Sequence, residues 1–293
     1  MLESLLKPEV LEQRTYEMFF MALAIGAISI TLSTIIGRGD EIAHLGVAFC
    51  CIAMAPILVR IIQMEEQKDN CERVGPFFGG YWTIIKTYSF YFLGIIVIFS
   101  LIFALLPEEY SVDIFSAQVK ELKAIRSLGS GRAVSGCGFL CILENNIGVL
   151  MLTILFSFVF GAGAIYIITW NASIIGVLIG LAAKEGAGQL TLVQISSALP
   201  PVCQSMVDGA CAGAGGYSII ISYLIALPCS ILALIPHGIF EIGAYFMAGL
   251  AGGIVSTISI SNSLPDREVL LHTGLLLLGA FLMVVIGALI ESV

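Results

Sequence analysis

Charged side chains are scarce in this 293-residue sequence, and their scarcity excludes most classes of soluble protein. Asp, Glu, Lys and Arg make up 12% of the residues and hydrophobic residues 58%, and the mean hydropathy is +1.02. Soluble domains have about 25% charged and about 45–50% apolar residues. The polar side chains here are too few to cover a surface in water, so the composition predicts that a lipid bilayer surrounds most of the chain.

Basic residues are scarcer than acidic ones, and the common catalytic and metal-binding motifs are missing. The chain has 13 Lys and Arg against 21 Asp and Glu, and this net charge of −8 argues against a nucleic-acid partner. The eight cysteines show no C-x-x-C spacing, and no H-E-x-x-H or phosphate-binding glycine loop occurs. Cys50, Cys51 and Cys229 lie in apolar runs, where Cys acts as a small hydrophobic residue. We expect no cofactor, no bound metal and no nucleic acid.

Long apolar runs dominate the rest of the sequence and predict an all-α polytopic membrane protein. Three ordinary spans are expected near 18–37, 43–62 and 87–106. A fourth, 147–168, is followed by Trp170 and Asn171, which interrupt it, and the apolar piece 172–183 then has the length of a half-helix or re-entrant segment. Three more apolar segments follow, at 217–235, 239–259 and 269–290. We therefore expect about six to eight membrane segments, some of them short or broken.

Polar connections divide the chain into two regions. Residues 1–17 have the pattern of an amphipathic interfacial helix, and 113–127 have that of a helix lying on the bilayer or capping the bundle. The Gly- and Ser-rich stretch 129–138 separates an N-terminal membrane region, 1–140, from a Gly-rich C-terminal module, 141–293. Segment 184–216 contains Pro200-Pro201 and reads as broken or re-entrant.

The run from Pro236 to Glu241 is the strongest candidate for a functional site. His237 and Glu241 are four residues apart, so on a helix they share one face. Ionisable groups inside membrane segments are functional candidates by default, although a structural His–Glu hydrogen bond that fixes a helix start is the simpler explanation of the pair. Asp208 is the single charge between Gly186 and Pro236. Zinc would need further ligands, and no spacing requires them.

Asparagines and small residues complete the candidate positions. Asn145 and Asn146 precede a clean span, where they can cap the helix or bond to a neighbouring helix. Asn171 is either a turn residue or a buried hydrogen-bonding residue. The candidate polar site therefore comprises His237, Glu241, Asp208, Asn145, Asn146 and Asn171. Gly176 with Gly180, and Gly249 with Gly253, have the four-residue spacing that lets helices approach closely in lipid.

These motifs occur in one order, and their combination over roughly residues 140–260 resembles the stage II sporulation protein M family. The elements that carry the resemblance are Asn145-Asn146 with Gly161 and Gly163, Asn171 with Gly176, Pro236-His237-Gly238 with Glu241, and then Ala248, Gly249 and Gly252. The resemblance implies a multi-pass inner or plasma membrane protein. The family's founding member is a membrane anchor or scaffold for enzymes that remodel septal peptidoglycan, so the resemblance implies a scaffold rather than a hydrolase, without the sporulation role.

The leading hypothesis is a non-enzymatic membrane scaffold or assembly component at the cell envelope, and no catalytic residue is assigned. Its expected partners are the lipid bilayer, further copies of itself as a dimer or larger oligomer, and other envelope proteins. We expect it in the plasma membrane with a cytoplasmic N-terminus. A transporter or channel with its polar site at Asp208, His237 and Glu241 is the first alternative. An intramembrane metal-dependent hydrolase that uses His237 and Glu241 is the second.

Overall fold

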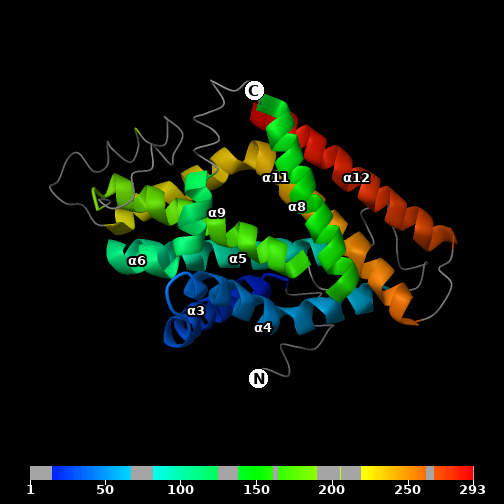
Figure 1. Ribbon diagram of the computed structural model, residues 1–293, viewed down its shortest axis with the longest axis horizontal. Helices are drawn as coiled ribbons and strands as arrows, with labels where there is room; N and C mark the ends of the chain where they lie inside the picture. Colours follow the sequence, from blue (N-terminus) through cyan, green and yellow to red (C-terminus); the bar gives the residue numbers. More distant parts are fainter. Residues whose placement is uncertain are drawn as a thin grey trace.

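The fold is helical throughout the residues that the computed structural model describes. These are 15–66, 82–124, 138–160, 164–189, 205, 219–261 and 267–292, without a few side chains inside helices, that of His237 among them. The all-α prediction is confirmed for these residues, which contain no strand. The labelled helices in Figure 1 are α3 (Glu17–Ile36), α4 (Glu41–Glu66), α5 (Trp82–Leu105), α6 (Glu108–Ile114), α8 (Gly138–Phe160), α9 (Ala164–Gly186), α11 (Ile219–Ser261) and α12 (Arg267–Ser292).

Among the described residues, seven helical segments are long and apolar enough to cross a bilayer, which confirms the expected polytopic membrane architecture. They are α3, α4, α5, α8, α9, α12 and the second part of α11, Gly238–Ser256. A shorter apolar stretch, Ile219–Leu232, forms the first part of α11. Because helices satisfy all their backbone hydrogen bonds internally, such segments are stable in lipid.

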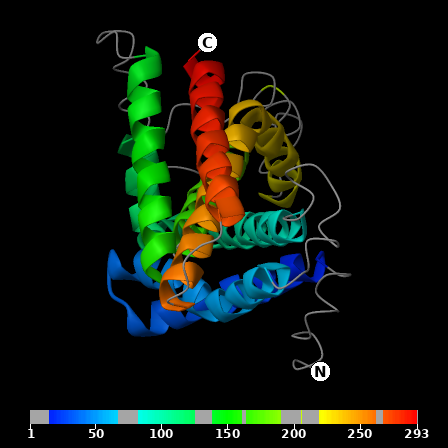
Figure 2. The same ribbon diagram turned by 90° about the vertical axis from the view of Figure 1, so that its right-hand side faces the viewer.

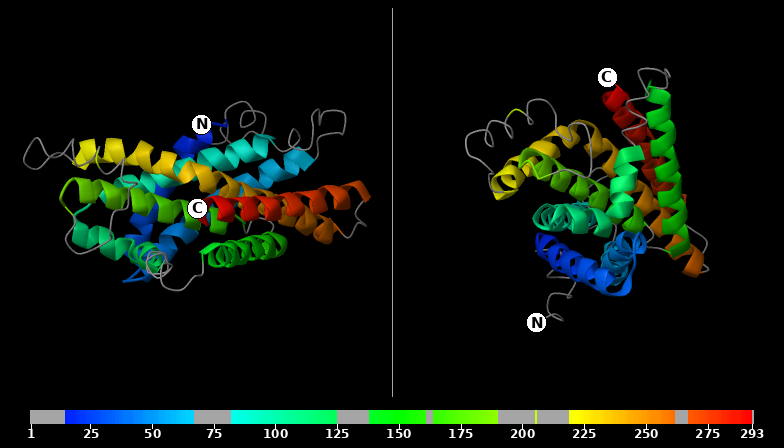
Figure 3. Two further views of the ribbon diagram at one scale, coloured as in Figure 1. Left: turned by 90° about the horizontal axis from the view of Figure 1, so that it is seen from above. Right: turned by 60° about the vertical axis from the view of Figure 1, so that its left-hand side comes forward.

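The helices form two groups that α11 joins. In the first group α5 packs between α3 and α9, and α4 packs against α3 and α9. In the second group α8, α11 and α12 all pack against one another, and Figure 2 shows α8 and α12 side by side. In the left view of Figure 3, α12 runs back along the later part of α11. α11 also packs on α9, so it links the two groups.

A proline kink lies in the middle of α11. This helix continues for 43 residues with Pro228 and Pro236 inside it. A proline inside a helix removes a backbone hydrogen bond and bends the axis, and Figure 1 shows α11 rising to a bend and then descending. Of the two possibilities that the sequence leaves for Pro236–Gly238, a hairpin or a kink, the structure has the kink.

The half-helix predicted at 172–183 is wrong, because α9 runs without interruption from Ala164 to Gly186. The preceding span, α8, ends at Phe160 rather than at 168. Asn171 does not break α9, because its Nδ2 donates a hydrogen bond to the carbonyl of Ile167, 2.8 Å away on the same helix. Trp170 stacks on Tyr166 one turn earlier, with their planes 8° apart. Both side chains are therefore accommodated inside a regular helix.

The polar connection after α5 folds onto the bundle. A second helix, which we call the cap helix (residues 116–124), follows α6 there. Phe115 lies against the rings of Phe99 and Phe103 of α5, with centroids 5.7 and 5.6 Å apart, and Val119 and Leu122 are buried. Of the two predicted roles for 113–127, the structure has the cap. The predicted helix at 1–17 and the re-entrant segment 184–216 lie almost entirely outside the described residues.

The cysteines differ in their chemical state. Cys50 and Cys51 are free thiols, and Cys50 is buried as its apolar run predicts. Cys141 and Cys229 are each disulfide-bonded. The expectation that Cys229 acts as a small hydrophobic residue is therefore wrong, because its sulfur is used in a covalent crosslink.

Candidate functional site

Two of the predicted polar residues, 95 positions apart in the sequence, meet between α8 and α11. The Nδ2 of Asn146 donates a hydrogen bond of 2.7 Å to Oε1 of Glu241. Asn146 is only 5% exposed, and its Oδ1 accepts a bond of 3.3 Å from Nδ2 of Asn145. The two asparagines thus act in an interhelical contact, and they lie within α8 rather than at its cap. A hydrogen bond to a carboxylate is among the stronger ones that a protein makes.

A third helix brings a second carboxyl group to this place. The carboxyl group of Glu291, near the end of α12, lies beside that of Glu241, so their like charges repel and the two share a hydrogen bond when one is protonated. In Figure 1 the end of α12 lies beside the start of α8. Glu291 was not among the predicted site residues, although an acidic residue at the end of an apolar run is a signal that could have identified it. We refer to Asn145, Asn146, Glu241 and Glu291 as the polar cluster.

The other predicted site residues do not join this cluster among the described side chains. Asn171 bonds within its own helix. His237 lies on α11 one turn before Glu241, in the predicted register, but its side chain is outside the described part, as is all of Asp208. Within the described residues, no three His, Cys, Asp or Glu side chains are placed to hold a metal ion.

The predicted helix-packing glycines lie at close helix–helix contacts. A Cβ at Gly176 would be 2.9 Å from the backbone oxygen of Ile96 in α5, and one at Gly180 would be 2.8 Å from Cβ of Phe103. A Cβ at Gly249 would be 2.4 Å from that of Ala164 in α9. Gly253 is buried in α11. Only glycine allows such approaches without displacing the neighbouring helix.

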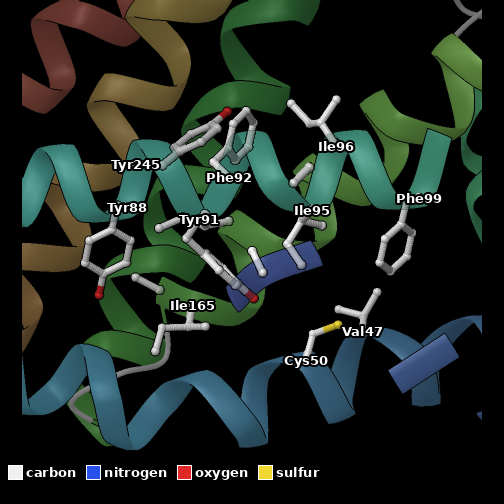
Figure 4. Close-up of a cluster of buried hydrophobic side chains, with 14 of the residues drawn as sticks. Val47, Cys50, Tyr88, Tyr91, Phe92, Ile95, Ile96, Phe99, Ile165 and Tyr245 are labelled. Atoms are coloured by element: carbon white, nitrogen blue, oxygen red, sulfur yellow. The ribbon is translucent and has the colours of Figure 1, made fainter. Parts of the chain in front are cut away.

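Neutral polar side chains also link helices of the first group. The hydroxyl of Tyr91 in α5 lies 2.7 Å from Oγ1 of Thr169 in α9, and Figure 4 shows the Tyr91 ring pointing toward α4. The hydroxyl of Ser100 lies 2.8 Å from that of Tyr223 at the start of α11. These contacts join α5 to both α9 and α11. These residues could not be predicted as interhelical contacts, because a single hydroxyl inside an apolar run has no distinctive pattern in the sequence.

Comparisons with protein-family models, curated proteins and solved structures give no match to this chain. The resemblance to the stage II sporulation protein M family therefore rests on the motifs of the sequence.

Proposed function

We propose that the chain is a multi-pass scaffold or assembly component of the cell envelope, without catalysis of its own. The observation that carries this proposal is the use of polar groups inside the membrane to join helices. Asn146 and Glu241 tie α8 to α11, and Ser100 and Tyr223 tie α11 to α5. Such bonds favour a rigid platform, because a satisfied polar pair holds two helices in one register.

The outer faces of the second group support binding of partners or of further copies. α8 and α12 are among the least buried spans, with 22% and 33% of their apolar windows buried. Met151 and Leu155 of α8 and Leu271 and Leu278 of α12 are each more than half exposed. These faces contact lipid or another membrane helix. A scaffold of this kind is a homo-oligomer or carries other envelope proteins on these faces.

The disulfide-bonded cysteines support a location in the plasma membrane with the N-terminus on the cytoplasmic side. Disulfides persist outside the reducing cytosol. With the start of α3 inside, successive crossings place the start of α8, and with it the disulfide-bonded Cys141, on the outside. We expect a reporter fused after α12 to be active outside the cell and one fused before α3 to be active inside. The opposite pattern would reverse this orientation.

A proton- or cation-coupled transporter is the second candidate, and one observation favours it. Glu241 and Glu291 lie in two different candidate membrane spans, and their carboxyl groups are neighbours. Intramembrane carboxyl groups are typical of ion pathways. In that case the polar cluster would take up and release the transported ion, and the kink at Pro236 would allow the helix beside it to move.

The substitution Glu241→Gln distinguishes the two functions. Its amide oxygen can still accept the hydrogen bond from Asn146, so a scaffold should keep its fold, its oligomeric state and its co-purifying proteins. A transporter should lose ion flux, because glutamine does not ionise. We expect no flux above that of empty liposomes for the wild type, measured with a pH-sensitive dye. Glu144→Gln, an exposed glutamate in the same span as Asn146, is the matched control. Wild-type flux that Glu241→Gln abolishes and Glu144→Gln retains would replace the scaffold with the transporter.

A further inference from the structure

The cap helix makes two different polar contacts with the bundle, an exposed ion pair on its outer side and a buried hydrogen bond on its inner side. On its outer side Lys120 forms an ion pair with Asp40 in the turn between α3 and α4. Both side chains are more than half exposed, at 66% and 59%. An exposed ion pair contributes little to stability and is weakened by salt. This ion pair therefore orients the cap helix but adds little to the stability of its packed position.

On its inner side the cap helix buries a polar group that is only half satisfied. Gln118 is 0% exposed. Its Nε2 donates a 3.2 Å hydrogen bond to Oγ of Ser173 in α9, whereas its Oε1 meets no donor among the described residues. Burying an unpartnered acceptor is unfavourable, because the oxygen loses its hydrogen bonds to water. The seated cap helix is thus destabilised at Gln118, which is fully buried.

Below Gln118 a line of neutral polar groups continues into the first helix group. Ser173 and Thr169 occupy successive turns of α9, so they share one face of that helix. Thr169 contacts the Tyr91 hydroxyl and the Cys51 thiol. We call Ser173, Thr169, Tyr91 and Cys51 the polar column. The cap helix covers its end at Ser173.

We propose that the cap helix is a reversibly seated plug over the polar column, latched by Asp40 and Lys120 and kept easy to release by the unpartnered oxygen of Gln118. Lifting the plug returns that oxygen to water, and it costs the Gln118–Ser173 bond and the burial of Val119 and Leu122. Ser173 remains satisfied, because its hydroxyl also donates to the carbonyl of Trp170, 2.7 Å away. The plug is a property of the first helix group and does not depend on the function proposed above.

Hydrogen–deuterium exchange of residues 116–124 in the full chain, in nanodiscs at pH 7, tests the plug. Gln118→Met keeps the size of the side chain and removes the buried oxygen, so we expect exchange about fivefold slower than in wild type. Lys120→Ala removes the latch, and we expect exchange about twofold faster. Lys123→Ala, an exposed lysine on the same helix, should exchange as wild type does. Faster exchange in Gln118→Met would show that Gln118 is an ordinary structural contact and would overturn the proposal.

The Asp40–Lys120 ion pair should stabilise the seated cap helix only over a defined pH range. The hydrogen bond from Lys120 lowers the pKa of Asp40 below its ordinary value of 3.8, and the Ser116 hydroxyl and the charges of Lys120 and His44 add to this shift. A carboxyl group whose pKa is lowered in the folded state stabilises that state above its unfolded pKa, and this contribution is lost as the pH falls through the folded pKa. After correction for intrinsic rates, wild type should exchange more slowly than Asp40→Asn at pH 7 and pH 5. The two should converge below about pH 4. A difference that disappears between pH 7 and pH 5 would contradict the latch.

Discussion

Replacing Gly176 with alanine is expected to lower the free energy of unfolding by about 1–3 kcal/mol, the usual cost of overpacking a tight core. The added Cβ would lie 2.9 Å from the backbone oxygen of Ile96 and 2.9 Å from Cβ of Phe99. Neither atom can swing aside, because both belong to or adjoin the backbone of α5. The helices α5 and α9 would have to separate and lose contacts along their shared face. Equilibrium unfolding in mixed micelles, followed by circular dichroism, measures this loss.

Two other glycines provide matched controls for Gly176→Ala. A Cβ at Gly148 in α8 would meet nothing within 4 Å, so Gly148→Ala should be neutral or stabilise the helix by up to about 1 kcal/mol. A Cβ at Gly243 would lie 2.5 Å from the terminal methyl of Met283, a flexible group that can rotate away. Gly243→Ala should therefore cost less than Gly176→Ala. Equal losses at Gly176 and Gly148 would show that close packing of α5 on α9 does not stabilise the protein.

The membrane architecture could be predicted from the sequence because composition and length determine it. Runs of about 20 apolar residues have few alternatives to a spanning helix in lipid. The prediction failed at α9, where Trp170 and Asn171 looked like an interruption. Whether a polar side chain ends a helix depends on its hydrogen-bond partner, and Asn171 finds its partner on its own helix. Spacing alone carries no information about that choice.

The polar cluster could be predicted only in part, and for a related reason. Asn146 and Glu241 are conspicuous because they stand at the edges of long apolar runs, and the structure brings them together. Glu291 could not be placed with them, because its partner depends on how α12 packs on α11. The same holds for Gln118. Its segment has an amphipathic pattern that predicts a cap, but the depth to which a cap is buried is a property of the tertiary structure.

Replacing Asn146 with leucine is expected to cost about 1–3 kcal/mol of stability, the range for leaving a buried polar group without its hydrogen-bond partner. Glu241 would then lose its amide donor, 2.7 Å away, while its carboxyl group stays between helices. Removing both partners should cost less than the sum of the single changes, because the amide and the carboxyl group that bond to each other are then removed together. We therefore expect Glu241→Met to be destabilising by itself, and the Asn146→Leu/Glu241→Met double variant to recover part of both losses.

The coupling between these two changes measures what the bond does for the fold. A coupling of about 1–2 kcal/mol would mean that Asn146 and Glu241 hold α8 against the kinked region of α11, as a rigid scaffold requires. Asn145→Ala, at the exposed neighbouring position, should show a smaller coupling with Glu241→Met, because Asn145 touches Glu241 only through Asn146. Strictly additive losses would mean that the two helices are held by apolar packing alone. In that case Glu241 would be stabilised by some other group, and the polar cluster would no longer support a scaffold over a transporter.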